Sequence, residues 1–556
     1  MGSAVLVQGG VAASLADAVP LEVGHAQLLA EAAHHFHEAG GEIGGQASSS
    51  HYDLLRLMKA FPGILGKAFW PNRCITSNLL NSFSLIMSSL SIFFVLSKRT
   101  LLLCATPCTG KGRYVNLAGI MLEELKLTRM MKQLEQSCEG FPDLRTGANS
   151  IYDLADVGMS AFSVFFTQSP SFLAHQRDMK LRKGRSNAES LFELRKIPCD
   201  NQVRKLLDPV NPEYLQSVYR NVFLALERTE VLKSRRSYAK QLLVAIDGTE
   251  YFSSKNIECE NCNHRELSNG KTNYYHSVLT PVIVQPGNEY VISLEPEFIV
   301  PQDGHEKQDC EIQAAKRWVE KYGDFYAKRG MTILGDDLFS RQPFCTALKD
   351  KKFHFILVCK PDSHTYLYET VEFLGSSRVM GTKVVRRWVG KYAEISSYRY
   401  VNELPLCGDP DALQVNWCEV TITREDTGEQ IYKNSFVTDF EVTETTVEAI
   451  ARDGRARWKI ENENNNVLKT KGYHLEHNFG HGDQHLASLL LSMNLLAFLF
   501  HTVLDLVDER YQAIRQALGT RGRFFQDLEA LLRYLPFKSW DDLLSFMFNG
   551  LELDTG

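Results

Sequence analysis

The chain has 556 residues, of which 44% are hydrophobic and 23% are charged. A chain of this length and composition can bury a large core in several lobes, and it is not an intrinsically disordered protein. The formal net charge of -6 neither indicates nor excludes a nucleic-acid partner, because phosphate contacts need only a local basic surface. Twelve cysteines without a signal-peptide pattern predict free thiols in a reducing compartment such as the cytoplasm.

Two apolar stretches are long enough to raise the question of a membrane span. Leu79–Leu96 is interrupted by Asn81 and several serines, so a core segment and a span both remain open for it. Leu486–Leu506 carries Asn494 and Asp505, whose transfer into lipid is costly. We therefore predict that the second stretch is a buried core helix, and we expect no membrane partner.

The first half of the chain divides into two regions. Residues 1–115 are rich in Gly, Ala and His and then in Ser and Leu, and we interpret them as an atypical extension of unknown role. Residues 116–240 have apolar residues at helical spacing and predict a helical region. From residue 177 to 240, 15 basic residues stand against 8 acidic ones. This surplus, which includes Arg182, Lys183 and Arg185, indicates a DNA-backbone surface, although ordinary solvated helix faces would give the same count.

Residues 241–360 predict an alternation of strands and helices. The apolar run Leu242–Ile246, the β-rich runs Tyr274–Val284 and Tyr290–Ile299 and the short run Met331–Leu334 are typical of strands. Helical spacing over Lys307–Arg329 precedes the last of these, and a further helix and strand follow it. This is the order of a ribonuclease-H-like mixed sheet, with three antiparallel strands first and parallel strands after the crossover helix.

The remaining segments complete the predicted architecture. Residues 361–441 are β-rich and predict an insertion of extra strands, and residues 442–510 return to helical spacing and complete the catalytic core. Residues 511–556 predict a helical tail. We therefore expect an α/β protein: a ribonuclease-H-like mixed sheet with a β-rich insertion, an N-terminal helical region and a C-terminal helical region.

Three acidic residues follow predicted elements at positions where this topology would bring them together. Asp247 ends the first strand, Asp336 ends the fourth, and Glu461 lies on the helix after the insertion. Three carboxylates can hold two Mg²⁺ ions about 3.5–4 Å apart, which activate an attacking oxygen and stabilise the leaving oxygen at phosphorus. Taken singly, an Asp-Gly pair is more often a turn, and Asp337 and Glu463 are alternative acids at their positions.

Three segments carry a specific resemblance. AIDGTEYFSS from residue 245, GDDLFSRQPF from residue 335 and RWKIENENNNVLKTKGYHLEHNFGHG from residue 457 resemble the catalytic blocks of bacterial insertion-sequence DDE transposases. The likeness covers roughly Val157–Leu506, and the closest type is the cut-and-paste group with a β-rich insertion before the glutamate. By matching position, Asp247, Asp336 and Glu461 would be the catalytic and metal-binding acids.

The resemblance implies a metal-dependent nuclease and strand transferase. It implies two Mg²⁺ ions, for which Mn²⁺ can substitute, and double-stranded DNA partners: the terminal inverted repeats of the element and the target DNA. It also implies a homodimer in the synaptic complex, no ATP, and a place on the bacterial nucleoid in the cytoplasm. Two alternatives stay open: an inactive DNA-binding relic of a transposase, and a ribonuclease-H-like nuclease that cuts without joining.

The segment around the glutamate departs from the family signature in two places. The signature runs Tyr, Arg, Glu and Lys, and this chain has Arg457 and Glu461 at the expected interval. Gly454 stands at the Tyr position and Leu468 at the Lys position, with Lys469 one residue later. We expect Arg457 to bind a DNA phosphate through its planar fork, and Lys469 to reach the same phosphate if the helix bulges.

Two further groups of residues could carry chemistry. Cys259 and Cys262, with His276 and Cys310 downstream, form a plausible structural zinc site, which competes with the interpretation that they are packed free thiols. Four histidines precede the long apolar stretch and are expected to cap the helix or to touch DNA; they are His474, His477, His481 and His485.

The insertion contains two tryptophans that bear on DNA binding. Trp388 and Trp417 are each candidates for stacking on a flipped base at the end of the element. Tryptophans at such positions are more often part of a core, and the sequence does not choose between the two residues.

Overall fold

The computed structural model describes residues 93–97, 100–104 and 115–116, then 123–146, 151–301, 310–375 and 379–554. The chain forms two compact units, residues 1–93 with 104–109 and residues 94–103 with 110–556, and nearly all the described residues belong to the second. Most of the predicted 1–115 extension and of the apolar segment from residue 79 lies outside the described residues. Three short strands are described in and just after this extension. They are β1 (Phe93–Ser97), β2 (Thr100–Cys104) and β3 (Val115–Asn116), which form a small sheet in that order.

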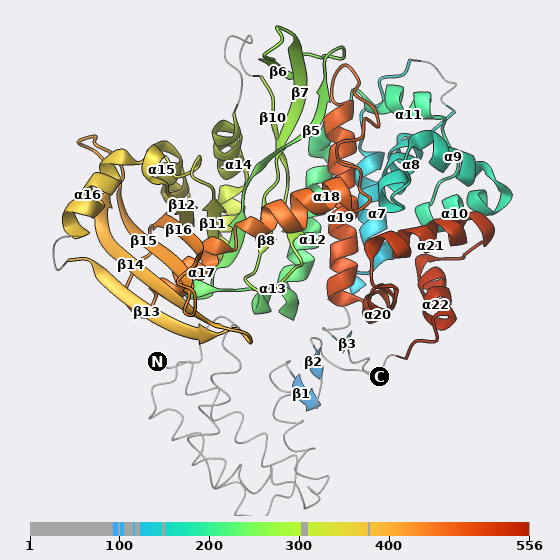
Figure 1. Cartoon of the computed structure of the whole chain (residues 1–556). Helices are drawn as coiled ribbons and strands as arrows, with labels where there is room; N and C mark the ends of the chain where they lie inside the picture. Colours follow the sequence, from blue (N-terminus) through green and yellow to red (C-terminus); the bar gives the residue numbers. More distant parts are fainter. Residues whose placement is uncertain are drawn as a thin grey trace, which may run out of the picture. The chain divides into compact units, whose positions relative to one another are not determined.

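A nine-stranded mixed sheet is the centre of the second unit (Figure 1). Its order is β13-β14-β15-β16-β12-β11-β4-β8-β9. Strands β4, β11 and β12 are parallel, whereas β8 and β9 extend the sheet beside β4 in antiparallel fashion. The strand bounds are β4 (Leu242–Ala245), β8 (Val282–Val284), β9 (Ile292–Ser293), β11 (Met331–Gly335) and β12 (His354–Val358).

The central strands are apolar throughout because both faces of the sheet are covered. All the residues of β4 and β11 are buried, as expected for parallel strands between helical layers. Helix α14 (Glu311–Tyr326) forms the crossover from the antiparallel strands to β11, and α15 (Gln342–Asp350) joins β11 to β12. The predicted order of strands and helices in this region, with the first and fourth strands as neighbours, is therefore the observed order.

The β-rich insertion continues the same sheet. Its strands form an antiparallel meander in which β16 pairs with β12, so that the insertion shares hydrogen bonds with the central strands. Helix α16 (Thr365–Gly375), at the start of the insertion, packs against β14. The bounds are β13 (Gly381–Trp388), β14 (Ala393–Pro405), β15 (Gln414–Arg424) and β16 (Gln430–Thr438).

A second, four-stranded sheet rises from the central one. β4 continues into β5 (Gly248–Ser254) after Asp247, and β7 (Thr272–Leu279) continues into β8 after Thr280. β5 and β10 (Glu297–Ile299) pair with β7 as antiparallel neighbours, and β6 (Asn263–Glu266) also pairs with β7. The two sheets therefore share a long hairpin, and Asp247 lies at the junction between them.

Helices from both ends of the described chain pack together beside the sheets (Figure 1). Phe162 and Phe500 meet edge to face at 5.5 Å, and Asn187 donates to the carbonyls of Leu532 and Leu535. The bounds are α7 (Leu127–Glu139), α8 (Leu154–Phe166), α9 (Phe172–Lys180), α10 (Arg182–Phe192), α11 (Asp200–Leu207), α12 (Gln216–Glu227), α13 (Glu230–Ser234), α19 (Leu486–Val507), α20 (Glu509–Leu518), α21 (Arg521–Tyr534) and α22 (Trp540–Gly550).

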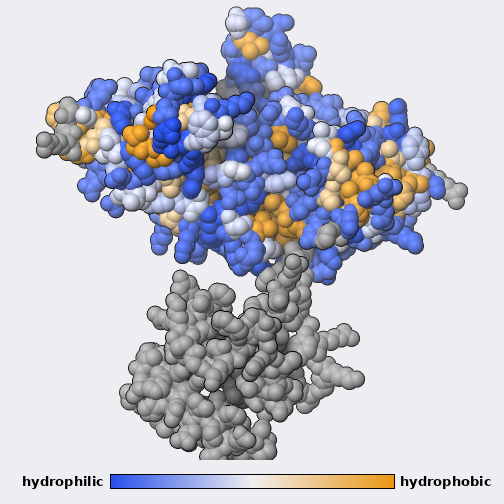
Figure 2. All heavy atoms as spheres, turned by 60° about the horizontal axis from the view of Figure 1, so that its bottom comes forward, coloured by the Kyte–Doolittle hydropathy of each residue, from blue (hydrophilic) through white to orange (hydrophobic). Residues whose placement is uncertain are grey.

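Helix α19 is long and apolar enough to cross a membrane, by length and composition alone. In this structure 89% of its apolar window is buried inside the protein, where Tyr219 donates to the carbonyl of Ser492 and Tyr473 bonds the ring of His501. The face shown in Figure 2 is mostly hydrophilic over the described residues, with hydrophobic residues in separate patches. The prediction of a buried core helix is confirmed.

The segment that carries the glutamate is not one regular helix. α17 (Val447–Arg455) ends in a turn, a π-helical stretch follows over Ile460–Asn465, and α18 (Asn466–Thr470) completes it. The structure therefore contains a bulge in this helical segment, which is the condition under which we expected Lys469 to reach the phosphate. A π-turn inserts an extra residue into the helical ladder, and such turns are frequent at functional sites.

Gly454 allows α17 to lie directly on the sheet. A Cβ at this position would lie 2.7 Å from Ile356 Cγ2 and 2.8 Å from the ring of Phe436. We expect Gly454→Ala to lower the free energy of unfolding by about 1–3 kcal/mol, because it overpacks the contact. Gly522→Ala in α21, where nothing lies within 4 Å, is the matched control and should be neutral or stabilising by about 1 kcal/mol. Urea denaturation that finds equal stability for the two variants would contradict this packing.

Candidate active site and metal centre

Asp247 and Asp336 are brought together by the pairing of β4 with β11. The two strands are parallel, and Ala245 of β4 is in register with Leu334 of β11. Each aspartate lies two residues beyond this pair, at the carboxyl ends of neighbouring strands. The backbone N–H of Ile246 continues the ladder by donating to the carbonyl of Leu334 at 2.9 Å. The sheet therefore fixes the backbones of both aspartates at one edge.

The side chain of the neighbouring Asp337 is engaged in hydrogen bonds with the loop after β12. Its Oδ1 accepts hydrogen bonds from the backbone N–H of Lys360 and from the hydroxyl of Ser363, both at 2.6 Å. Among the interactions of the described residues, the Asp336 carboxylate accepts only a turn hydrogen bond, from the backbone N–H of Leu338 at 2.9 Å. Asp337 thus holds the loop after β12, which leaves Asp336 as the acid at the strand end.

Glu461 reaches the same cluster from the π-helical stretch. Its Oε1 accepts a hydrogen bond from Arg457 at 2.7 Å, and its negative charge contributes to raising the pKa of Asp247. Glu463, the alternative third acid, lines a separate pocket together with Asp505 and Arg521. Of the two glutamates, Glu461 is therefore the one that acts electrostatically on Asp247.

Glu311 is a fourth carboxylate that the sequence did not reveal. It is the first residue of α14, and its side chain lies against Gly248, where a Cβ would be 2.4 Å from the Glu311 Cδ. Burial raises the pKa of Glu311, the charge of Asp336 raises it further, and a backbone hydrogen bond from Gly248 lowers it. The sequence placed the start of this helix at Lys307, which put Glu311 in the helix interior and gave no reason to single it out.

Asparagines of the π-helical stretch hold Asp247 in place. Asn465 donates from Nδ2 to Asp247 Oδ2 at 3.2 Å, and Asn464 donates to the side-chain oxygen of Asn465 at 2.9 Å. Thr280, at the other strand of the hairpin, donates its backbone N–H to the Asp247 carbonyl at 3.1 Å. These contacts connect the glutamate segment to the end of β4. The sequence showed the run of asparagines but not this partner.

Negative charge accumulates in the cluster, with Arg457 as its cationic neighbour. Burial, followed by the charges of Glu311, Asp336 and Glu461, raises the pKa of Asp247 to about 7, although Arg457 acts in the opposite direction. A divalent cation would favour the ionised form of a carboxyl that resists ionisation because it is desolvated and has other carboxylates around it. The donor atoms are all oxygens, which suits Mg²⁺ or Mn²⁺.

The acidic cluster is open rather than tight. Among the described residues, only a group of Cys and His side chains has ligand atoms that all lie within 4.8 Å of one another. The oxygen atoms of the acidic cluster are spread more widely than this. Two ions about 3.5–4 Å apart are bound by carboxylates on opposite sides, so one common centre for all the oxygens is not required.

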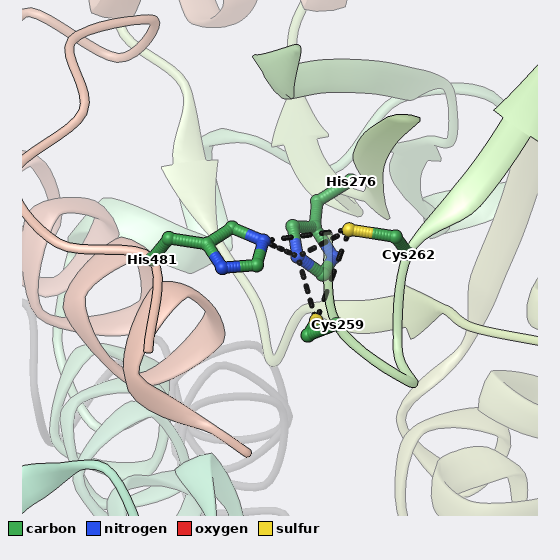
Figure 3. A group of neighbouring side chains, drawn as sticks. All are labelled: Cys259, Cys262, His276 and His481. Carbon is green, nitrogen blue, oxygen red and sulfur yellow. Dashed lines mark hydrogen bonds between the residues drawn. The ribbon is translucent and has the colours of Figure 1, made fainter. Parts of the chain in front are cut away.

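The compact metal-ligand group consists of Cys259, Cys262, His276 and His481 (Figure 3). The two sulfur atoms lie 3.8 Å apart, and the Nε2 atoms of the two histidines lie 3.1 Å apart. The prediction of Cys259, Cys262 and His276 as a metal-ligand group is supported, whereas Cys310 is exposed and is not part of it. The fourth ligand position belongs to His481, which the sequence reading treated as a cap or DNA contact.

The predicted DNA-contacting residues fall in different surroundings. Arg457 is bonded to Glu461, and Lys469 forms an ion pair with Glu476 at 2.9 Å. Lys183 and Arg185 on α10 are exposed and form no ion pair with any described residue. The side chain of Arg182, in the same helix, lies outside the described part of the chain.

The two tryptophans of the insertion are distinguished by burial. Trp417 is fully buried in β15, where it meets Tyr368 edge to face at 5.9 Å. Trp388, at the end of β13, is 62% exposed. Trp417 is therefore a core residue and cannot stack on a base, whereas Trp388 is accessible.

Comparisons with known proteins give a distant likeness to a solved structure. No protein-family model matches the chain, and no curated protein matches it. The chain is similar to the piggyBac transposase in a cryo-EM structure of its synaptic complex with hairpin DNA, with 13% sequence identity and a TM-score of 0.33. The match covers 78% of this chain and 82% of the other. These values establish neither a shared fold nor a shared function.

The raised pKa of Asp247 predicts a pH-dependent stability of the metal-free protein. The folded state keeps a proton on Asp247 up to about pH 7, whereas the unfolded state loses it near pH 4. The free energy of unfolding should therefore fall as pH rises between these values and should level off above them. We expect Asp247→Asn to become more stable than the wild type over this window, by roughly 1–3 kcal/mol at pH 8.

Chemical denaturation at several pH values with a chelator present measures this difference. Asp527→Asn removes an exposed carboxylate from α21 and serves as the control, with no pH-dependent gain expected. A constant difference between Asp247→Asn and the wild type from pH 4 to pH 8 would show that the carboxylates do not repel one another as described.

Proposed function

We propose that this chain is a DDE transposase that cleaves DNA at the ends of a mobile element and joins those ends to target DNA. The observation that carries the proposal is the register of β4 with β11, which sets Asp247 beside Asp336, together with the electrostatic effect of Asp336 and Glu461 on Asp247. The likeness of the three surrounding segments to the catalytic blocks of insertion-sequence transposases supports the same conclusion. The order of β9, β8, β4, β11 and β12 supports a ribonuclease-H-like core.

Asp247, Asp336 and Glu461 would hold two Mg²⁺ ions, and Glu311 would lie beside them. The bound ions would supply activation of the attacking oxygen and neutralisation of the leaving oxygen in an in-line displacement at phosphorus. The residues of this chain prepare the site: Asn465 orients the carboxylate of Asp247 through its amide N–H. The pairing of β4 with β11 fixes the spacing of the two aspartates, and no nucleotide cofactor is needed.

Arg457 would orient the DNA phosphate. In the DNA-free protein its guanidinium is bonded to Glu461, so it would exchange this partner for a phosphate oxygen when the carboxylate binds metal. Tyr432 and Arg457 line one pocket together with Gly454. Since Gly454 has no room for the tyrosine of the family signature, we infer that the phenol of Tyr432 supplies that contact from β16.

Other surfaces of the protein would position the DNA. Lys183 and Arg185, with Arg182, would bind the phosphates of the terminal inverted repeats, and Trp388 would contact bases from the insertion. Two copies of the chain would hold paired ends in a synaptic complex on the bacterial nucleoid. Lys469 is bonded to Glu476 and would first have to leave that partner.

Two observations favour a second candidate, a DNA-binding relic without activity. The ion pair of Lys469 with Glu476 and the absence of a side chain at Gly454 remove two contacts of the family signature. A relic would bind the element ends without cutting them. A nuclease without joining activity would cut them and leave the ends free.

Cleavage and joining assays on the DNA that flanks the reading frame separate these candidates. We expect the wild type with Mg²⁺ to cut that DNA and to join the ends to a plasmid. Asp247→Asn, Asp336→Asn and Glu461→Gln should each lower the cleavage rate at least about 100-fold, beyond the loss typical of residues outside a metal-ligand set. Glu463→Gln, on the same helical segment, is the control and should retain activity.

The outcomes of this assay are distinct. Binding without cleavage by the wild type would support the relic, and cleavage without joining would support a simple nuclease. Full activity in any of the three acid variants would remove that residue from the site.

The basic helix α10 gives an independent prediction about DNA affinity. The double variant Lys183→Ala/Arg185→Ala should weaken DNA binding about tenfold at moderate salt and should reduce the slope of log K against log salt by about 2. The control Lys328→Ala/Lys349→Ala removes the same charge at the edge of the sheet opposite the acids. Fluorescence anisotropy at several salt concentrations measures the affinity and the salt slope of each double variant. An equal effect of the two double variants would show that the DNA does not bind at α10.

A further inference from the structure

Four potential metal ligands converge from three segments of the chain (Figure 3). Cys259 and Cys262 lie in the loop between β5 and β6, His276 lies in β7, and His481 lies in the loop between α18 and α19. A turn in which the N–H of Cys262 donates to the Cys259 carbonyl at 3.1 Å brings the two sulfur atoms to the same side. His276 and His481 are 205 residues apart in the sequence, so only the fold brings their side chains together.

The sulfur–sulfur distance and three sulfur–nitrogen distances are close to the edges of a tetrahedron around zinc, and the nitrogen–nitrogen distance is somewhat shorter. With Zn–S of about 2.3 Å and Zn–N of about 2.0–2.1 Å, tetrahedral edges are about 3.8 Å for S–S, 3.5 Å for S–N and 3.4 Å for N–N. The sulfur atoms of Cys259 and Cys262 are 3.8 Å apart, and three sulfur–Nε2 distances are 3.5, 3.4 and 3.4 Å. The Nε2 atoms of His276 and His481 are 3.1 Å apart.

The orientation of His481 also suits a metal ligand. Its Nδ1 lies 2.7 Å from the carbonyl of Gly482, so this nitrogen carries the proton and donates it. Nε2 then presents a lone pair to the centre of the group, which is the arrangement that outer hydrogen bonds impose on metal-bound histidines. The carbonyl of Gly482 therefore fixes the tautomer that zinc binding requires.

The chemistry of the donor atoms identifies the cation. Two sulfur and two nitrogen ligands in a tetrahedron favour zinc over Mg²⁺ or Ca²⁺, which prefer oxygen. All four positions are filled by protein atoms, and Cys262, His276 and His481 are buried. Such closed sites are structural, whereas catalytic zinc sites keep one position open. The sulfur separation also excludes a disulfide, whose S–S bond is about 2.05 Å.

We propose that Cys259, Cys262, His276 and His481 bind a structural Zn²⁺ that joins the four-stranded sheet to the loop before α19. The sheet carries Asp247 and Thr280 at its base, where β5 begins and β7 ends. The loop follows the helical segment that carries Glu461. The zinc therefore ties together the two parts of the chain that supply the acidic cluster.

Hydrogen bonds also fix the loop before α19, so that a zinc ion would bind a loop that is already held in place. The carboxylate of Asp208 accepts hydrogen bonds from the backbone N–H groups of Asp483, Gln484 and Leu486. Asn261, between the two cysteines, donates to the carbonyl of Gln484 at 2.7 Å. These bonds anchor the loop to α11 and to the cysteine turn, so that His481 is held ready for the metal. The zinc adds a link between Cys262 and His481, which are 219 residues apart.

Metal analysis of the full-length protein tests this proposal. The chain is produced in zinc-supplemented medium, passed over a chelating resin and analysed by inductively coupled plasma mass spectrometry. We expect about one zinc per chain for the wild type. Removal of the zinc by a strong chelator should lower the thermal midpoint by more than about 5 °C, because binding energy at a structural site contributes to folding.

Variants separate this site from other metal-binding groups. Cys262→Ser and His481→Asn should each lower the zinc content at least about tenfold, whereas Cys310→Ser, which changes an exposed cysteine outside the group, should keep it. The zinc content does not depend on the proposed DNA chemistry. Asp247→Asn should accordingly keep its zinc while losing cleavage, and this distinguishes a failure of one proposal from a failure of the other.

The wild type alone decides the question if the variants do not fold. Cobalt in place of zinc should give a thiolate charge-transfer band in the near ultraviolet and the intense visible bands of tetrahedral cobalt. A folded wild type that contains no zinc and binds no cobalt, or a weak octahedral cobalt spectrum, would overturn the proposal. Zinc retained by both Cys262→Ser and His481→Asn would also overturn it.

Discussion

The desolvation of Asp247 at the end of β4, together with the repulsion from the carboxylates around it, is the constraint on which the candidate active site depends. Asp247 is held there by the register of β4 with β11, and Asp336 follows the same register on the neighbouring strand. Burial and the surrounding negative charges oppose ionisation of Asp247, so the site costs stability in the absence of a cation. The nine-stranded sheet provides the rigid support, because its central strands are buried and hydrogen-bonded on both sides. A bound divalent cation would remove the repulsion. The same carboxylates that destabilise the protein without a cation would then serve as its ligands.

The glutamate segment and the proposed zinc centre act on this cluster from the other side. The π-helical stretch carries both Glu461, whose charge acts on Asp247, and Asn465, which donates to the same aspartate. The two residues are four positions apart and therefore lie on one face of the segment. The loop that follows is fastened to the four-stranded sheet by His481 and to α11 by Asp208. Both parts of the acidic site are therefore held by contacts that lie outside it.

The sequence predicted the parts of the fold that depend on local pattern. Apolar runs that end in Asp247 and Asp336 identified the two strands, and helical spacing identified α14 and α19, since burial on the sheet or in the helical part leaves a periodic pattern. It did not predict Glu311, whose role depends on the start of a helix. It left a bulge in the glutamate segment open, because no periodicity marks a π-turn. Cys310 was proposed as a zinc ligand and His481 was not, because the fourth ligand comes from a segment whose proximity only the tertiary structure creates.

The most direct measurement of the central claim is anomalous X-ray diffraction from crystals of the wild type soaked in Mn²⁺, which scatters anomalously and can take the place of Mg²⁺. The acidic cluster described above requires a manganese peak within coordinating distance of the carboxylates of both Asp247 and Asp336, about 2.2 Å from their oxygens. Ordered crystals soaked at high Mn²⁺ with no anomalous peak between these two residues would contradict the account.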